Sequence, residues 1–174
     1  MRPSVDHLST VDFSCKSLTD HVNSLYFRSM FTLSHRIAIH AEPDRVWQVL
    51  TEFSAYPDWN PYLKRVTGEL GIKRKLKIEM QLQTGHPYLA KPRVLEIENE
   101  SKLTFRSRLY FPGFYDVTHF FVVLPTTKHR TELTYTQEWK GKVAQGLYKK
   151  MGKETEDAIL AMLKALKKRV QQME

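Results

Sequence analysis

The chain has 174 residues, of which 41% are hydrophobic and 26% charged, and its 27 Lys and Arg against 19 Asp and Glu give a formal net charge of +8. A chain of this length forms one domain with a core of its own and is too short for a two-domain enzyme with a complete dinucleotide-binding half. The single cysteine, Cys15, excludes an intramolecular disulfide framework and a thiolate zinc site, and it fits a reducing compartment.

The first part of the chain, residues 1–33, shows no sustained apolar period. We expect it to be a loosely ordered extension, and Met30, just before the first regular segment, offers an alternative translation start. The extension lacks a basic stretch followed by an apolar core, and nowhere does the chain hold about 18 consecutive uncharged apolar residues. These features predict no secretory signal, no membrane span and a cytoplasmic protein.

A strand and a helical region follow the extension. His35–His40 alternates as a half-buried strand does. Pro43 is suited to the first turn of a helix, and apolar residues then recur at helical spacing through Phe53. Two prolines punctuate the compact turn that comes next, in which Trp59, Tyr62 and Leu63 are predicted to share the inner face of a single helical turn.

The centre of the chain changes to a period of two. Its strand-like runs are residues 66–70, 76–82, 93–98, 103–109, 117–124 and 132–139. Turn signals such as Gly71 and Pro112-Gly113 separate them, and because such short connections join consecutive strands, we expect an antiparallel meander. From Val143 the helical period returns; at about 1.5 Å per residue this helix is on the order of 40 Å long, enough to lie across a whole sheet.

The C-terminal helix is amphipathic and basic. Its apolar stripe contains Leu147, Met151, Ala158, Ile159, Met162, Leu163, Leu166 and Val170. Its other faces carry Lys149, Lys150, Lys153, Lys164, Lys167, Lys168 and Arg169. One interpretation is a weak contact with RNA or an anionic membrane through this helix, and the other is a solvated lysine-rich face.

Two sets of motifs stand out. The first is Glu42–Leu50 followed by Phe53, Tyr56, Pro57, Trp59, Asn60 and Pro61, and the second is Arg106–Asp116, His119–Phe121 and Gln137–Gly141. They resemble the START-like, or SRPBCC, superfamily and its polyketide cyclase/dehydrase-like branch. The resemblance implies an α+β helix-grip domain over residues 34–174, with two short helices after strand one and a curved antiparallel sheet of about six to seven strands wrapped around the long C-terminal helix. Most members bind apolar or aromatic small molecules between sheet and helix; a minority are cyclases or dehydratases, and some associate with ribosomes.

Alternation along the strands identifies the face that we expect to line such a cavity. The candidate ligand-binding residues on strands are Ile78, Met80, Leu82, Phe105, Ser107, His119, Phe121, Leu133, Tyr135, Gln137 and Trp139. The helical stripe adds Met151, Ile159 and Met162, and analogy with the superfamily places Trp59, Tyr62 and the turn of residues 111–115 at the entrance. The same alternation directs Leu109 inward and Arg108 outward, unless a bulge intervenes.

Among these candidates, His119, Tyr135 and Gln137 are the polar groups that we expect to converge in the cavity. In an apolar cavity they orient the polar end of a ligand while the apolar walls supply affinity. In an ordinary core their hydrogen bonds are instead made with one another or with a bound water. We predict the first arrangement, and with it the binding of a hydrophobic, aromatic or lipid-like small molecule.

The sequence leaves two alternatives to a binding protein. The first is an enzyme of the polyketide cyclase/dehydratase type with His119 as acid or base, because imidazole titrates near neutrality. No nucleophile beside a base and no glycine-rich phosphate loop is recognisable, and His35 and His40 face opposite sides of their strand, so we expect no cofactor and no metal. The second is a basic RNA- or ribosome-associated protein. The oligomeric state is left open.

Overall fold

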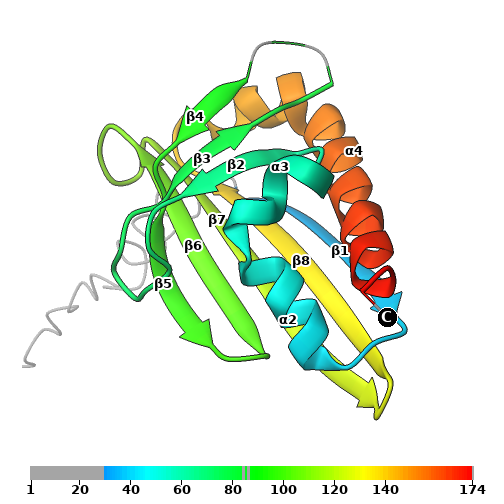
Figure 1. The fold of residues 1–174 in the computed structure, drawn as a ribbon. Coiled ribbons are helices and arrows are strands. Elements are labelled where there is room, and N and C mark those ends of the chain that lie inside the picture. The colour runs from blue at the N-terminus through cyan, green and yellow to red at the C-terminus, as the bar shows by residue number, and fades with distance from the viewer. Residues whose placement is uncertain (1–29, 84, 86, 174) are drawn as a thin grey trace, which may run out of the picture.

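The computed structural model describes residues 30–83, 85 and 87–173. Its elements in chain order are β1 (Phe31–Ile39), α2 (Pro43–Thr51), the 3-10 helix η1 (Phe53–Ala55), α3 (Tyr56–Trp59), β2 (Leu63–Thr67), β3 (Lys77–Met80), β4 (Tyr88–Ala90), β5 (Arg93–Glu98), β6 (Lys102–Leu109), β7 (Tyr115–Thr127), β8 (Arg130–Lys140) and α4 (Ala144–Gln171) (Figure 1). The expected extension lies outside the described residues up to position 29, as does Cys15. The last residues of the expected extension, 31–33, are described and belong to β1.

The strands form two antiparallel sheets. The larger sheet has the order β1-β8-β7-β6-β5, and the smaller has the order β2-β3-β4. In the larger sheet the β7–β8 register pairs His119 with Gln137 and Phe121 with Tyr135. Backbone hydrogen bonds between residues 73–76 and 92–94 join the two sheets. The expected strand runs correspond to β2, β3 and β5–β8, and the structure adds the short strand β4.

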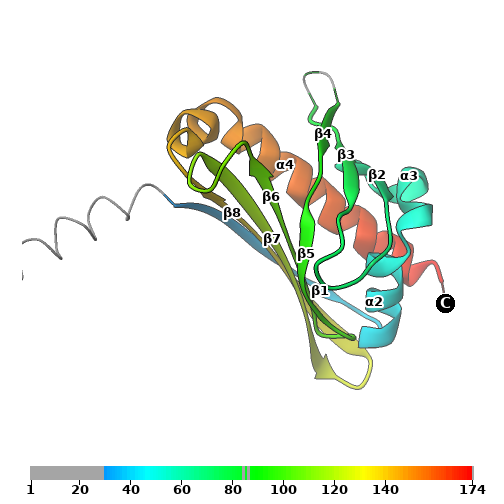
Figure 2. The same ribbon diagram turned by 90° about the vertical axis from the view of Figure 1, so that its left-hand side faces the viewer.

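Both sheets curve around α4, as Figures 1 and 2 show, with α2 and α3 near the C-terminal half of that helix. This is the predicted helix-grip fold. The buried side of α4 is its predicted apolar stripe, with Ala158, Ile159, Met162, Leu163, Leu166 and Val170 in the core. Each buried leucine contributes about 1.5–3 kcal/mol by leaving water. No helix within the described ranges combines the length and apolar composition that crossing a membrane requires.

The first helix is shorter than its periodicity predicted. α2 ends at Thr51, whose hydroxyl donates to the carbonyl of Trp47 at 2.8 Å. Glu52 then takes φ −76° and ψ 71°, outside the helical region, and Phe53 begins the separate helix η1. The prediction that one helix continues through Phe53 is therefore wrong, although its side chain still packs against the core.

A second correction concerns the turn before β2. Asn60 Oδ1 accepts hydrogen bonds from the backbone N–H groups of Tyr62 at 3.0 Å and Leu63 at 2.8 Å, so α3 ends at Trp59. Pro61, which has no N–H, cannot continue the helix either. Trp59, Tyr62 and Leu63 therefore do not share one helical turn as predicted.

Candidate ligand-binding cavity

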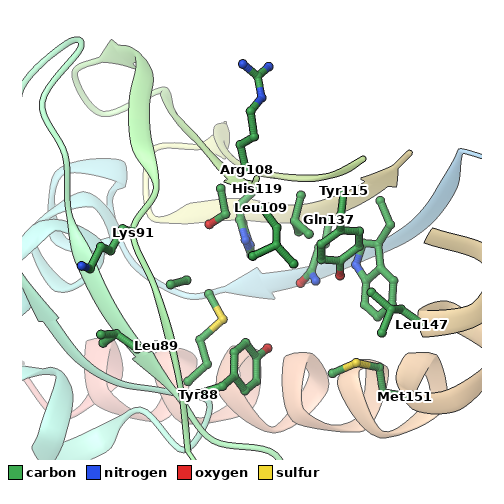
Figure 3. A pocket seen from close by; sticks show the side chains of 15 residues that line it. Tyr88, Leu89, Lys91, Arg108, Leu109, Tyr115, His119, Gln137, Leu147 and Met151 are labelled. Atoms are coloured by element: carbon green, nitrogen blue, oxygen red, sulfur yellow. The ribbon is translucent and has the colours of Figure 1, made fainter. Parts of the chain in front are cut away.

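A cavity of about 420 Å³ lies between the two sheets and the N-terminal half of α4 (Figure 3). Its wall consists of Met80, Tyr88, Leu89, Ala90, Lys91, Ser107, Arg108, Leu109, Tyr115, Val117, His119, Gln137, Trp139, Leu147 and Met151. Most of these side chains are apolar or aromatic, and small-molecule sites span roughly 300–1,000 Å³. The fold therefore holds a site of the right size and character for a small apolar ligand.

Cross-strand pairing positions the inner wall. His119 on β7 lies between Phe105 on β6 and Gln137 on β8, and in the neighbouring row Val117 lies between Ser107 and Trp139. Because side chains of one face recur every second residue, these two rows point to the same side of the sheet. Phe105 also stacks on the His119 ring at 4.7 Å between ring centres, which fixes the orientation of the imidazole.

A chain of hydrogen bonds links the polar side chains of this wall. His119 Nδ1 lies 2.7 Å from the Tyr135 hydroxyl, and that hydroxyl donates to Gln137 Oε1 at 2.9 Å. The Tyr62 hydroxyl donates to the same oxygen at 3.4 Å and lies 3.5 Å from the hydroxyl of Tyr88. The structure therefore brings together the three polar residues singled out in the sequence and adds two tyrosines to them.

Burial determines the protonation of these groups. His119 is 1% exposed, and desolvation lowers the pKa of its imidazole to about 3, so the ring is neutral at physiological pH. Burial also raises the pKa of the Tyr62 and Tyr135 hydroxyls well above the usual tyrosine value. Both tyrosines therefore keep their protons and remain hydrogen-bond donors.

Three wall residues carry buried polar atoms that have no hydrogen-bond partner in the described part of the protein. They are Nε2 of His119, Oγ of Ser107 and Nε1 of Trp139. An unsatisfied buried donor or acceptor costs about 1–3 kcal/mol. A ligand that pairs with one of these atoms removes part of that cost, so they are the natural polar contacts of the site.

At one end of the cavity β6 passes into the turn before β7. Arg108 contributes to the wall there, but Figure 3 shows its guanidinium directed away from the cavity, and its Nε donates to Asp116 Oδ1 at 2.7 Å. Leu109 is half exposed, and the turn beyond it exposes Tyr110 and Phe111 to solvent. Of the entrance region expected by analogy, Tyr115 at the end of this turn lines the cavity.

The candidate residues divide into three groups. Met80, Ser107, His119, Gln137, Trp139 and Met151 line the cavity. Ile78, Leu82, Phe105, Phe121, Leu133, Tyr135, Ile159 and Met162 are buried in the packed core outside the wall. Tyr62 is fully buried and Trp59 packs edge-on against Tyr56 at 4.9 Å, and neither is among the residues that line the cavity.

Of the smaller sheet, the sequence predicts Met80 in the cavity wall but not the contribution of β4 and the residue after it. Residues 88–91, in β4 and just after it, supply Tyr88, Leu89, Ala90 and Lys91 to the wall. A strand of three residues is too short to show alternation, and the turn signal at Gly85 was the sole indication of a hairpin there. Leu147, which is on the predicted helical stripe but not among the candidate site residues, also lines the cavity and packs against the buried cluster of Val117, Trp139 and Ala144.

Comparisons with known proteins agree with this architecture. The family model described as polyketide cyclase / dehydrase and lipid transport matches residues 30–171. The solved Zhui aromatase/cyclase from Streptomyces sp. R1128 is similar to the chain, with a TM-score of 0.70 and 16% identity over 83% of this chain and 95% of that one. No curated protein sequence matches.

Two further solved structures have the same fold. A START superfamily protein from Mycobacterium smegmatis gives a TM-score of 0.64 and 21% identity over 82% of this chain and 99% of that one. Norcoclaurine synthase from Thalictrum flavum, in complex with dopamine and hydroxybenzaldehyde, gives a TM-score of 0.60 and 16% identity over 98% of this chain and 99% of that one. Likeness at these identities concerns the fold, since one fold serves many activities.

Proposed function

We propose that this chain, which belongs to the polyketide cyclase / dehydrase and lipid transport family, binds an apolar or aromatic small molecule in the cavity between its sheets and α4. The observation that carries the proposal is an apolar cavity of about 420 Å³ with His119 and Gln137 in its wall, held by the buried Tyr135. Each Å² of apolar ligand surface that enters it contributes on the order of 25 cal/mol. The polar side chains fix the orientation of the ligand.

The aromatic character of the wall narrows the ligand class. Tyr88, Tyr115 and Trp139 surround the cavity together with the imidazole of His119, and aromatic rings pair favourably with one another beyond the area they bury. Related folds serve aromatic chemistry: one neighbour is an aromatase/cyclase, and another was solved with dopamine and hydroxybenzaldehyde. We therefore assign this chain a preference for ligands with fused or single aromatic rings over saturated chains.

A cyclase or dehydratase with His119 as acid or base has weaker support. A general acid must hold a proton at working pH, and a pKa of about 3 leaves the imidazole almost entirely deprotonated. The same low pKa makes the ring a poor general base, because catalysis by proton transfer is most efficient with a pKa near the operating pH. Binding without turnover is the function that fits this environment.

The direct test is native mass spectrometry of protein from its own host, followed by a titration with pyrene, whose fluorescence reports transfer into an apolar site. We expect a co-purifying apolar molecule or saturable pyrene binding. Ala90→Phe fills the cavity and should weaken pyrene binding at least about tenfold, a loss of about 1.4 kcal/mol. Leu95→Phe, at an exposed position of β5 outside the wall, is the matched control and should leave binding unchanged.

Absence of both a bound molecule and pyrene binding would refute the proposal. Equal binding by wild type and Ala90→Phe would show that pyrene binds elsewhere on the surface and would also count against it. Recovery of a chemically altered ligand after incubation would replace simple binding with catalysis.

A further inference from the structure

The hydrogen-bond chain behind the cavity has a defined direction. Gln137 Oε1 is an acceptor and receives the proton of the Tyr135 hydroxyl at 2.9 Å, with a second proton from Tyr62 at 3.4 Å. A hydroxyl has one proton, so Tyr135 has none left for His119. The 2.7 Å contact between Tyr135 and His119 must therefore be a donation from Nδ1–H of the imidazole to the tyrosine oxygen.

This direction fixes the tautomer of His119. A neutral imidazole carries one proton, and it is on Nδ1, so Nε2 bears a lone pair and can only accept. Nε2 is buried and has no hydrogen-bond partner within the described residues. Figure 3 shows the His119 side chain entering the cavity from β7. Met80 in the same wall has a flexible side chain, so the site can adjust around a ligand.

We propose that the cavity selects ligands that present a neutral hydrogen-bond donor, above all a phenolic or alcoholic hydroxyl, to Nε2 of His119. This inference rests on the proposed function and adds to it the polar group that the ligand must carry. An ether or a ketone of the same size leaves Nε2 unpaired and gains nothing from this contact.

The other unpaired atoms of the wall do not determine this choice. Ser107 Oγ can donate or accept, so it tolerates a hydroxyl, an ether or a carbonyl. Trp139 Nε1 can only donate and is indifferent to whether its acceptor carries a proton. Discrimination between a hydroxyl and its methyl ether therefore depends on His119.

Matched fluorescent probes test the selection. Titrations of the wild-type protein at pH 6.5 use pyrene, 1-hydroxypyrene, 1-methoxypyrene and 1-acetylpyrene, which share one ring system and differ in their polar group. We expect 1-hydroxypyrene to bind about tenfold more tightly than 1-methoxypyrene or 1-acetylpyrene, because only it satisfies Nε2. His119→Phe keeps a ring of similar size beside Phe105 and should reduce this ratio to about one. Because both probes are measured on the same variant, a general loss of affinity cancels from the ratio.

The outcomes separate the two proposals. If pyrene binds but the hydroxyl and methoxy probes bind equally, the selection is refuted and the binding function stands; tightest binding of 1-acetylpyrene refutes it as well, because it requires a proton on Nε2. If no probe binds, both proposals fail. Long-range ¹⁵N–¹H correlation spectra of the wild-type protein read the tautomer without any substitution: a bare Nε2 supports the inference, and a protonated Nε2 overturns it.

Discussion

Gly141 connects β8 to α4 and supports the turn beside the cavity. Its φ of 121° lies where side chains are strongly disfavoured. A Cβ at this position would overlap the carbonyl oxygen of Phe114 and lie 2.6 Å from its carbonyl carbon and 2.9 Å from the backbone nitrogen of Tyr115. Each of these atoms is backbone, so no rotation of a side chain relieves the overlap. Gly141→Ala should therefore destabilise the fold and displace the turn that ends at the cavity wall.

The magnitude has two parts. A side chain in a disfavoured backbone conformation costs about 1–3 kcal/mol, and forcing an extra carbon into a packed site costs about 1–3 kcal/mol more. The sum of about 2–6 kcal/mol is a large fraction of the 5–15 kcal/mol that holds a typical domain together.

Two other glycines allow the cost of the backbone conformation to be measured apart from the cost of the overlap. Gly113 has φ 81° with nothing within 4 Å of its added Cβ, so Gly113→Ala incurs the backbone cost alone. Gly146, in α4, has neither a positive φ nor a close neighbour, so Gly146→Ala should stabilise by about 0.5–1 kcal/mol. Urea unfolding followed by circular dichroism measures all three. If Gly141→Ala costs no more than Gly113→Ala, the argued backbone overlap does not exist.

Three other predictions concern the cavity and the polar side chains in and behind its wall. Tyr135→Phe removes the hydroxyl that joins His119 to Gln137 and should lower the free energy of unfolding by about 1–3 kcal/mol; an unchanged urea midpoint would contradict this. Burial lowers the pKa of His119 from 6.5 to about 3, so as pH drops the unfolded chain takes up a proton before the folded protein does. The free energy of unfolding should therefore fall as pH drops from 6.5 toward 3, and it should fall less in His119→Phe. Urea titrations at pH 7.5 and 5 measure this fall, and equal falls in wild type and His119→Phe would refute the prediction. Pyrene affinity should hardly change between about 50 and 500 mM salt, whereas a contact with RNA phosphates would weaken steeply.

Much of the fold follows from local pattern. β8 alternates over its whole length, and Leu133, Tyr135, Gln137 and Trp139 are all buried as that alternation predicts. The apolar stripe of α4 likewise identifies its packed side. Both signals are periodic and long, so single exceptions do not obscure them.

The boundary between cavity and core could not be predicted in this way. His119 and Phe121 share one face of β7, yet His119 lines the cavity and Phe121 packs in the core. The difference arises along α4: Met151 faces the cavity, whereas Ile159 belongs to the main core cluster. How closely a helix approaches a sheet at each turn depends on contacts between elements far apart in the sequence, which alternation does not encode.

The cavity spans the junction of the two sheets. Met80 and Tyr88 in its wall belong to the smaller sheet, and His119 and Gln137 belong to the larger one, while the backbone joins the sheets at residues 73–76 and 92–94. A bound molecule touches both sheets and binds neither of them once they separate. By mass action, a ligand at 100 times its Kd adds about 2.7 kcal/mol to the free energy of unfolding. On the proposed function, the resistance of this protein to heat therefore depends on what its cavity contains.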